Sequence, residues 1–286
     1  MGVNFQDVAF TYFPNKKESK NIYVLKDINL SIDTKDEFIC VVGHTGSGKS
    51  TLMQLMNALL LPTKGKINID EKEIKPKNNK NLKEIRKKIG LVFQFPEYQL
   101  FEDTILKDVS FGPTNFKLDN PVERAKNALA KFNIDEKFYE RNPYRLSGGE
   151  MRKVAISGIL ASEPEVLILD EPTVGLDPYT KEELINLLLK IKEEDHKTII
   201  IVTHDMNVLW RVATRVILVD EAGICYDGNK YDLFKNSELV KAHYLEDPDI
   251  VKILKEVKNT LNIDIDPFQD DINKAVLEIE RGDNGK

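Results

Sequence analysis

A glycine-rich segment between an apolar run and an amphipathic run has the residues that bind a nucleoside triphosphate. It fits the pattern G-x-x-x-x-G-K-[ST]. Glycines let consecutive backbone N–H groups turn toward phosphate oxygens, and the start of a following helix adds positive potential. We expect Lys49 to reach the β- and γ-phosphates and Ser50 to ligate Mg²⁺, while His44 holds an unrestricted position and receives no catalytic role. The predicted nucleotide contacts here are Gly43, His44, Thr45, Gly46, Ser47, Gly48, Lys49, Ser50 and Thr51.

Two apolar runs each end in an Asp-Glu pair, the residues that triphosphate hydrolysis needs at the end of a buried strand. One carboxylate can hold the Mg²⁺ shell, and the other can orient the attacking water. Periodicity does not separate the two pairs, but the first is followed by a proline-containing turn that carries a further carboxylate, Asp177. We therefore predict that Asp170 and Glu171 are the hydrolytic pair, and that Asp220 and Glu221 form a solvent-facing turn.

The segment Leu146-Ser147-Gly148-Gly149-Glu150 has the sequence of a helix start. Ser147 and Glu150 have the spacing of a capping box. The two adjacent glycines are left unexplained by capping, because glycine is costly early in a helix. Bare N–H groups at a helix start suit an anion, so this segment is a second candidate for a phosphate contact.

The elements that position these residues alternate along the chain. Apolar and polar residues alternate up to about Asp33, as in half-buried strands, and a continuous apolar run from Phe38 to Val42 predicts a buried parallel strand. Beyond a mostly helical stretch, further strands and helices are expected at 166–169, 181–194, 198–202, 206–213 and 216–219. This order predicts an α/β fold with a mainly parallel sheet flanked by helices. The acidic tail from about Asn236 is predicted to be a small helical unit.

The composition is that of a globular chain with an acidic balance. The 286 residues are 41% hydrophobic and 31% charged, with a formal net charge of -6. No basic footprint of a nucleic-acid binder is expected, and no apolar run is long enough for a membrane span. There is no basic-then-apolar leader, so any contact with a membrane should go through another protein. Cys40 and Cys225 lie far apart in apolar strands and are expected to be reduced core residues.

The segment from Leu146 to Glu150 resembles the signature motif of ABC ATPases, and the resemblance extends from about Val3 to Phe234 with the diagnostic elements in the family's order. It implies a P-loop NTPase with an ABC-type core, an antiparallel N-terminal β subdomain and a helical signature subdomain at about 95–162. The nucleotide-binding domain would be 1–235, and 236–286 would be a C-terminal helical extension for subunit pairing.

In that family the signature of one subunit contacts the γ-phosphate held by the other, which implies a dimer with two nucleotides. Tyr12 matches the aromatic residue that stacks on adenine, Gln94 the glutamine that senses Mg²⁺ or water, and His204 the histidine that contacts the γ-phosphate. The contacts implied across the dimer are Ser147, Gly148, Gly149 and Asp177. The implied Mg²⁺ ligands are Ser50, Gln94 and Asp170, and the implied catalytic residues are Glu171, His204, Lys49 and Gln94.

The phosphate loop combined with the segment from Phe93 to Phe101 is similar to the ATPases of energy-coupling factor transporters, and closest to the second of their two paralogous ATPases. This resemblance implies uptake of vitamins or transition-metal ions, with ATP and Mg²⁺ as cofactors, at the cytoplasmic face of the cell membrane. The implied partners are a sister ATPase in a heterodimer, an integral-membrane coupling protein and substrate-binding membrane proteins, without nucleic acid. We expect Glu97 to pair with a basic residue of the coupling protein.

Two alternative functions are the ATPase of a conventional ABC importer and an ABC ATPase outside transport. The segment from Phe95 to Phe101 and the lack of a β-rich regulatory domain after Phe234 favour the energy-coupling factor type over the first. The second usually brings a coiled-coil insertion or two ATPase domains in one chain, and neither pattern is found in this sequence.

Overall fold

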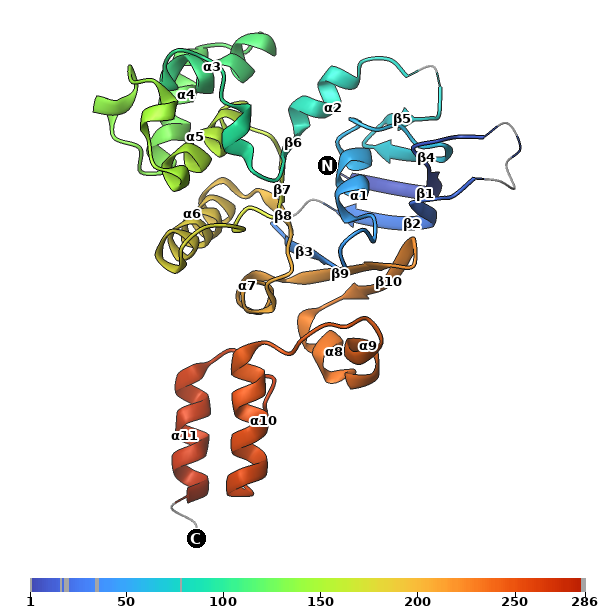
Figure 1. Cartoon of the computed structure of the whole chain (residues 1–286), viewed down its shortest axis with the longest axis vertical. Helices are drawn as coiled ribbons and strands as arrows, with labels where there is room; N and C mark the ends of the chain where they lie inside the picture. Colours follow the sequence, from blue (N-terminus) through green and yellow to red (C-terminus); the bar gives the residue numbers. More distant parts are fainter. Residues whose placement is uncertain (1, 16, 18–20, 34–35, 78, 284–286) are drawn as a thin grey trace.

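The computed structural model describes residues 2–15, 17, 21–33, 36–77 and 79–283. In this part of the chain, a central sheet lies between a second, smaller sheet and a lobe of helices, and a pair of helices projects from the opposite end (Figure 1). The N-terminal strand lies within the body of the molecule, whereas the last described helix lies in the projection.

The central sheet has six strands within the described residues, in the order β10-β9-β3-β8-β7-β6. Its neighbours are parallel except β10, which pairs antiparallel with β9. The strands are β3 (Phe38–Val42), β6 (Ile89–Val92), β7 (Val166–Asp170), β8 (Thr198–Val202), β9 (Arg215–Asp220) and β10 (Gly223–Gly228). Cys40 is buried in β3 as expected, but the expectation for Cys225 is wrong: it is exposed, because β10 is an edge strand.

Both faces of the central sheet are covered, as the continuous apolar runs predict. Along β3, Phe38, Cys40 and Val42 join one buried cluster, while Ile39 and Val41 join another. Successive strand residues point to opposite faces, so an apolar core lies on each side. The predicted α/β fold with a mainly parallel sheet flanked by helices is therefore confirmed.

The smaller sheet is antiparallel in the order β2-β1-β4-β5. Its strands are β1 (Gly2–Phe10), β2 (Leu25–Asp33), β4 (Lys64–Ile69) and β5 (Lys72–Ile74). Along β2 the residues Ile28, Leu30 and Ile32 are buried and their neighbours exposed, which is the alternation seen in the sequence. This sheet packs with α1 (Lys49–Met56) against the central sheet.

The helical lobe is inserted between β6 and β7. After α2 (Leu82–Lys88) and β6, the lobe contains a 3₁₀ turn at Pro96–Gln99, α3 (Ile105–Asn115), α4 (Pro121–Lys131), 3₁₀ turns at Glu136–Phe138 and Pro143–Arg145, and α5 (Gly148–Leu160). Helices α6 (Pro178–Asp195) and α7 (Met206–Val212) follow β7 and β8. They bury apolar residues in the same cluster as the lobe, so the lobe and the central sheet share one core.

Helix α8 (Lys230–Lys235) follows β10, and the tail then forms α9 (Ser237–Ala242), α10 (Asp249–Leu261) and α11 (Ile272–Asp283). Helices α10 and α11 run side by side and enclose a small core of Leu254, Ile263, Ile265 and Ala275. Helix α10 ends at Leu261, because Asn262 takes a left-handed conformation with φ 52°. None of the described helices is long and apolar enough to cross a membrane.

Candidate functional site

The phosphate loop connects the end of β3 to the start of α1, as predicted. Gly43 has φ 142°, and a Cβ there would lie 2.0 Å from the backbone oxygen of Val219. Gly48 has φ 102° and begins α1 without a side-chain cap. Only glycine fits these two positions. The first-turn N–H groups of α1 are therefore available to an anion.

Lys49 is buried, and its Nζ donates to the backbone oxygens of Gly43 and His44, each at 2.8 Å. Burial lowers the pKa of Lys49, although the carboxylates of Glu171, Asp170 and Asp220 oppose this. Ser47 Oγ is buried and has no hydrogen-bond partner among the described residues. A buried cation beside an unpartnered hydroxyl in a loop of turned N–H groups fits a triphosphate chain.

Asp170 ends β7, and Glu171 follows it in a left-handed conformation with φ 49°. Burial raises the pKa of Asp170, and a hydrogen bond with the Ser50 side chain partly offsets this. Burial, and then the charge of Asp170, raises the pKa of Glu171 to about 7. A divalent cation at Asp170 and Ser50 would lower the cost of both buried charges, so these residues fit Mg²⁺.

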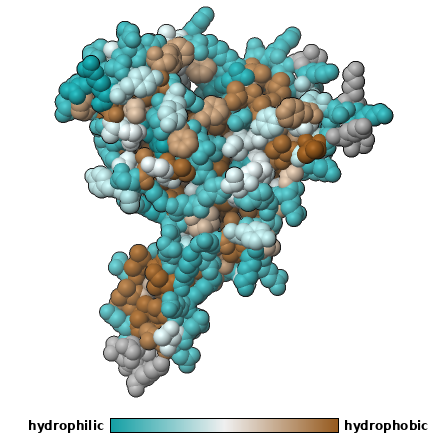
Figure 2. Space-filling view, viewed as in Figure 1, coloured by the Kyte–Doolittle hydropathy of each residue, from teal (hydrophilic) through white to brown (hydrophobic). Residues whose placement is uncertain are grey.

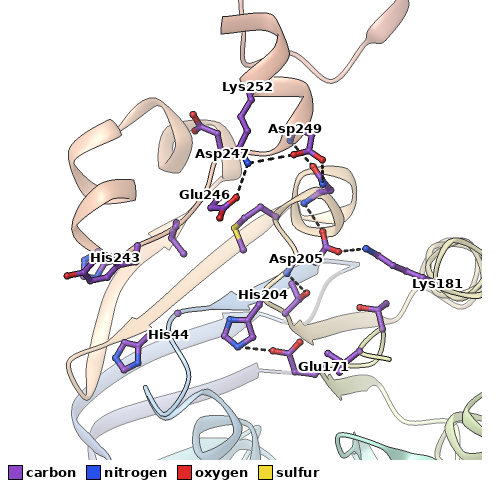
Figure 3. A pocket seen from close by; sticks show the side chains of 18 of the residues that line it. His44, Glu171, Lys181, His204, Asp205, His243, Glu246, Asp247, Asp249 and Lys252 are labelled. Carbon is purple, nitrogen blue, oxygen red and sulfur yellow. Dashed lines mark hydrogen bonds and ion pairs between the residues drawn. The ribbon is translucent and has the colours of Figure 1, made fainter. Parts of the chain in front are cut away.

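His204 follows β8 and faces this carboxylate pair. Its Nε2 lies 3.1 Å from Glu171 Oε1, at ion-pair distance but without hydrogen-bond geometry (Figure 3). Burial, and then the charge of Lys49, lowers the pKa of His204. The strand order therefore brings together Lys49, Ser50, Asp170, Glu171 and His204, as the sequence predicted.

The prediction that Asp220 lies in a solvent-facing turn is wrong. Asp220 is 7% exposed, with Oδ1 2.8 Å from His44 Nε2 and Oδ2 2.7 Å from His243 Nδ1. Burial alone would raise its pKa, but the hydrogen bonds from His243 and the Glu221 N–H, with the charges of both histidines, hold it below the usual value. The reason is the strand order, since β9 lies beside β3 and its end reaches the phosphate loop. Glu221 is exposed, as predicted.

The predicted capping box begins α5. Ser147 Oγ accepts from the Glu150 N–H at 3.4 Å, and Glu150 Oε2 accepts from the Ser147 N–H at 2.9 Å. Ser147 and Gly148 are exposed, and a Cβ on Gly148 would meet nothing within 4 Å. In Figure 1, α5 lies in the helical lobe, apart from α1. One chain therefore does not bring its signature to its own phosphate loop.

The remaining predicted contacts are Tyr12, Gln94 and Asp177. Tyr12 is half-exposed, and its hydroxyl is 3.1 Å from Thr51 Oγ1. Gln94 is exposed just after β6, which ends at Val92. Asp177 is exposed and caps α6 by accepting from the N–H groups of Tyr179 and Thr180, each at 3.0 Å. Among the described residues, no hydrogen bond or ion pair joins these three side chains to Glu171 or His204.

Sequence reasoning missed Arg152, a buried cation of α5. Its Nε and Nη2 donate to the two carboxylate oxygens of Glu97 at 3.1 and 2.8 Å, and its Nη1 donates to the backbone oxygens of Pro172 and Val174. Glu97 was expected to pair with a basic residue of a membrane protein, and the structure instead places both of its oxygens on Arg152. A cation among the apolar positions of α5 was the one available signal.

A cavity of about 690 Å³ opens beside Glu171 and His204. One wall contains Gly43, His44, Glu171 and His204. The opposite wall is formed by residues 243–252, and Figure 3 shows Glu246, Asp247, Asp249 and Lys252 there, across from Glu171 and His204. The nucleotide-binding loops and the C-terminal extension thus face the same space.

A glycine loop around a buried lysine, beside carboxylates at the ends of parallel strands, is the arrangement of a P-loop ATPase. A helical lobe between β6 and β7, with a capped Gly-Gly helix start, narrows this class to the ATP-binding-cassette ATPases. Consistent with this, residues 25–174 match the ABC transporter family.

The curated relatives specify the family. The energy-coupling factor transporter ATP-binding protein EcfA2 of Enterococcus faecalis is 45% identical over 251 residues, which cover 87% of this chain and 86% of that protein. EcfA2 of Streptococcus agalactiae is 42% identical over 287 residues, covering 99% of this chain and 100% of that protein. The chain belongs to the family of energy-coupling factor transporter ATP-binding proteins, and is an ATP-binding, ATP-hydrolysing transporter subunit.

A solved structure agrees with this family. The chain superposes on cbiO1 from Clostridium perfringens, described as part of the ABC transporter complex cbiONQ, with a TM-score of 0.73 and 35% identity, covering 91% of this chain and 95% of that one.

Proposed function

We propose that the chain energises an energy-coupling factor importer of vitamins or transition-metal ions, using ATP and Mg²⁺ at the phosphate loop. The observation that carries this proposal is the convergence of Lys49, Asp170, Glu171 and His204 in a chain similar to EcfA2 proteins along most of its length. A conventional importer is the second candidate, but no structural observation favours it.

In the proposed site, Lys49 binds the β- and γ-phosphates and Tyr12 stacks on adenine. Ser50, Asp170 and Gln94 would hold Mg²⁺, which supplies charge neutralisation at the phosphates. Glu171 accepts a hydrogen bond from the attacking water and orients it in line with the γ-phosphate. His204 donates from Nε2 to the developing charge.

The second half of each site would come from another subunit. Ser147 and Gly148 are exposed at the start of α5, and Asp177 is exposed at the start of α6, so these residues are available to a nucleotide held by a partner. Gly149, the remaining proposed contact, is partly buried beside Thr180. We assign 1–235 to the nucleotide-binding domain, including a helical subdomain at about 95–162, and 236–286 to the extension for subunit pairing. The working dimer is a heterodimer with a sister ATPase.

Two surfaces support the proposed assembly. Helices α10 and α11 expose Ile253, Ile272, Val276 and Leu277, and Figure 2 shows a brown patch on the projection. We propose that this apolar surface pairs with the sister ATPase. Near Gln94, the aromatic side chains of Phe95, Tyr98 and Phe101 are exposed. We propose that this segment meets the membrane coupling protein and that the chain therefore works at the cytoplasmic face of the cell membrane.

Affinity purification of tagged protein from mildly solubilised native membranes tests the proposal, with the co-purifying chains identified by mass spectrometry. We expect a second ABC ATPase, a coupling membrane protein and small substrate-binding membrane proteins, and the last would identify the cargo. A Val276→Asp variant should lose the second ATPase selectively, whereas Glu193→Gln, an exposed position on α6, should retain it. Recovery of conventional permeases would favour the second candidate, and recovery of only soluble partners would contradict transport.

A further inference from the structure

The C-terminal extension is connected to the phosphate loop through Asp220. His243, which follows α9, donates from Nδ1 to Asp220 Oδ2 at 2.7 Å. The other oxygen of Asp220 lies 2.8 Å from Nε2 of His44 in the phosphate loop. The backbone oxygen of His44 in turn accepts from Lys49 Nζ at 2.8 Å. A continuous chain of polar contacts therefore runs from the extension to the lysine that faces the phosphates.

The side chains that form this connection are held in fixed positions, so a movement of one of them shifts the next. Asp220 is 7% exposed, and the side chain of His243 is 14% exposed, so water competes weakly for their bond. The Glu221 N–H also donates to Asp220 Oδ1 at 2.7 Å, which fixes the carboxylate orientation. His44 is held on its other side, because its Nδ1 lies 2.7 Å from the backbone oxygen of Thr45.

A second connection joins the extension to the segment that carries His204. Asn207, in the first turn of α7, donates from Nδ2 to Asp249 Oδ2 at 2.7 Å. The Asp249 N–H donates back to Asn207 Oδ1 at 2.8 Å. Asp205, next to His204, accepts from the N–H groups of Asn207 and Val208 and so fixes the same turn. The Asn207 side-chain amide thus bonds both the carboxylate and the backbone N–H of Asp249, and two bonds fix the distance and the orientation of these residues.

Both connections start from residues 243–252, the wall of the cavity that faces Glu171 and His204 (Figure 3). We propose that residues 243–252 are a positioning element of the ATP site, with a separate action on each catalytic loop. His243 holds the phosphate loop in its binding conformation through Asp220 and His44. Through Asn207, Asp249 holds the segment that carries His204 at the distance from the bound nucleotide that catalysis requires. A shift of the extension, or a change in its pairing with another subunit, would therefore change the conformation of the nucleotide site.

The two connections predict different kinetic defects in the full-length protein. His243→Leu removes the donor to Asp220 and should raise the dissociation constant and KM for ATP about fivefold, the lower end of typical coupling between sites, with kcat nearly unchanged. His243→Asn should restore tight binding, because its amide nitrogen can take the place of Nδ1. Asp249→Ala should instead lower kcat about fivefold with the ATP dissociation constant unchanged. Asp249→Asn retains an acceptor oxygen and should keep most of the wild-type kcat.

A matched control is His196→Asn, which replaces an exposed histidine that contacts Asp36 far from the cavity and should change neither constant. Three results would overturn the proposal. One is equal ATP affinity in wild type and His243→Leu, and another is an equal defect in both His243 variants. The third is that the His243 and Asp249 variants change KM and kcat in the same way. The proposal depends on ATP binding at the phosphate loop but not on the proposed partners or cargo. The Lys49→Ala variant distinguishes failure of the ATP site from failure of the positioning element. If Lys49→Ala binds ATP like wild type, the assignment of the ATP site is wrong. If Lys49→Ala loses ATP binding but the His243 and Asp249 variants behave like wild type, only the positioning element is refuted.

Discussion

Two strands of the central sheet end in the same dipeptide, and the two ends have different neighbours. Strands β7 and β9 are both buried apolar runs followed by Asp-Glu, and Glu171 and Glu221 share a left-handed backbone with φ 49° and 48°. At the first end, both carboxylates face the lysine and histidine of the ATP site. At the second, Asp220 is held between two histidines and Glu221 is exposed.

The comparison shows that local sequence and backbone conformation do not assign the chemistry of a strand end. The difference comes from the order of strands, since β9 is next to β3 whereas β7 is separated from β3 by β8. The end of β9 contacts the phosphate loop directly, because the backbone oxygen of Val219 lies against Gly43 and leaves no room for a Cβ there. The end of β7 lies across the loop, where a carboxylate can share a cation with Ser50.

The largest expected effect separates the two glutamates. Glu171→Gln should reduce ATP hydrolysis about 10³-fold with ATP binding retained, because the amide cannot orient water as a base. Glu221→Gln makes the same chemical change at the same backbone conformation and should leave both quantities unchanged. Steady-state phosphate release and equilibrium ATP binding, measured on both variants, check this. A similar loss from both variants would show that the two ends are not functionally distinct.

A second difference between the two ends is the support of the turn that follows. Arg152 holds the backbone after Glu171 and is neutralised by Glu97, and no such cation follows Glu221 among the described contacts. Glu97→Gln should lower the free energy of unfolding by about 3 kcal/mol at pH 7, because it leaves a buried charge without its partner. Urea denaturation measures this, with the exposed Glu193→Gln as a control that should show no loss.

The pair also predicts the sign of a pH effect. Burial alone would raise the pKa of Glu97, but Arg152 holds it below its ordinary value of 4.5. The stabilisation is therefore complete above that value and is lost as the pH falls through the lower folded-state pKa. The stability difference between wild type and Glu97→Gln should be constant near pH 7 and shrink below 4.5. A difference that grows on acidification would contradict the assigned partner.

The smallest expected effect concerns the shared left-handed conformation. Non-glycine residues pay about 1 kcal/mol or more for it, and at the second end no catalytic role requires the glutamate. Glu221→Gly should therefore raise the free energy of unfolding by roughly 0.5 kcal/mol after the unfolded-chain entropy of glycine is counted. Thermal unfolding of Glu221→Gly and wild type checks the gain, and a destabilised variant would indicate a contact that its exposed side chain does not show.

What could be predicted from the sequence was local. The pattern from Gly43 to Ser50 requires specific backbone angles, and the spacing of Ser147 and Glu150 produces a capping box, so both were found where expected. The pairing of Asp220 with His243 and the pairing of Glu97 with Arg152 depend on which elements become neighbours across 23 and 55 residues of sequence. No periodicity encodes that adjacency, and for this reason Asp220 was placed in a solvent-facing turn and Arg152 was missed.

The most direct test of the distinction between the two strand ends is a Mg²⁺ titration of ATP hydrolysis at saturating ATP in Asp170→Asn and Asp220→Asn. We expect Asp170→Asn to lose apparent Mg²⁺ affinity by about 100-fold, since it removes the proposed charged metal ligand. Asp220→Asn should keep the Mg²⁺ dependence of the wild type and change only the affinity for ATP. Normal Mg²⁺ dependence in Asp170→Asn, or a loss of Mg²⁺ affinity in Asp220→Asn, would contradict the assignment of the first pair to hydrolysis and of Asp220 to positioning.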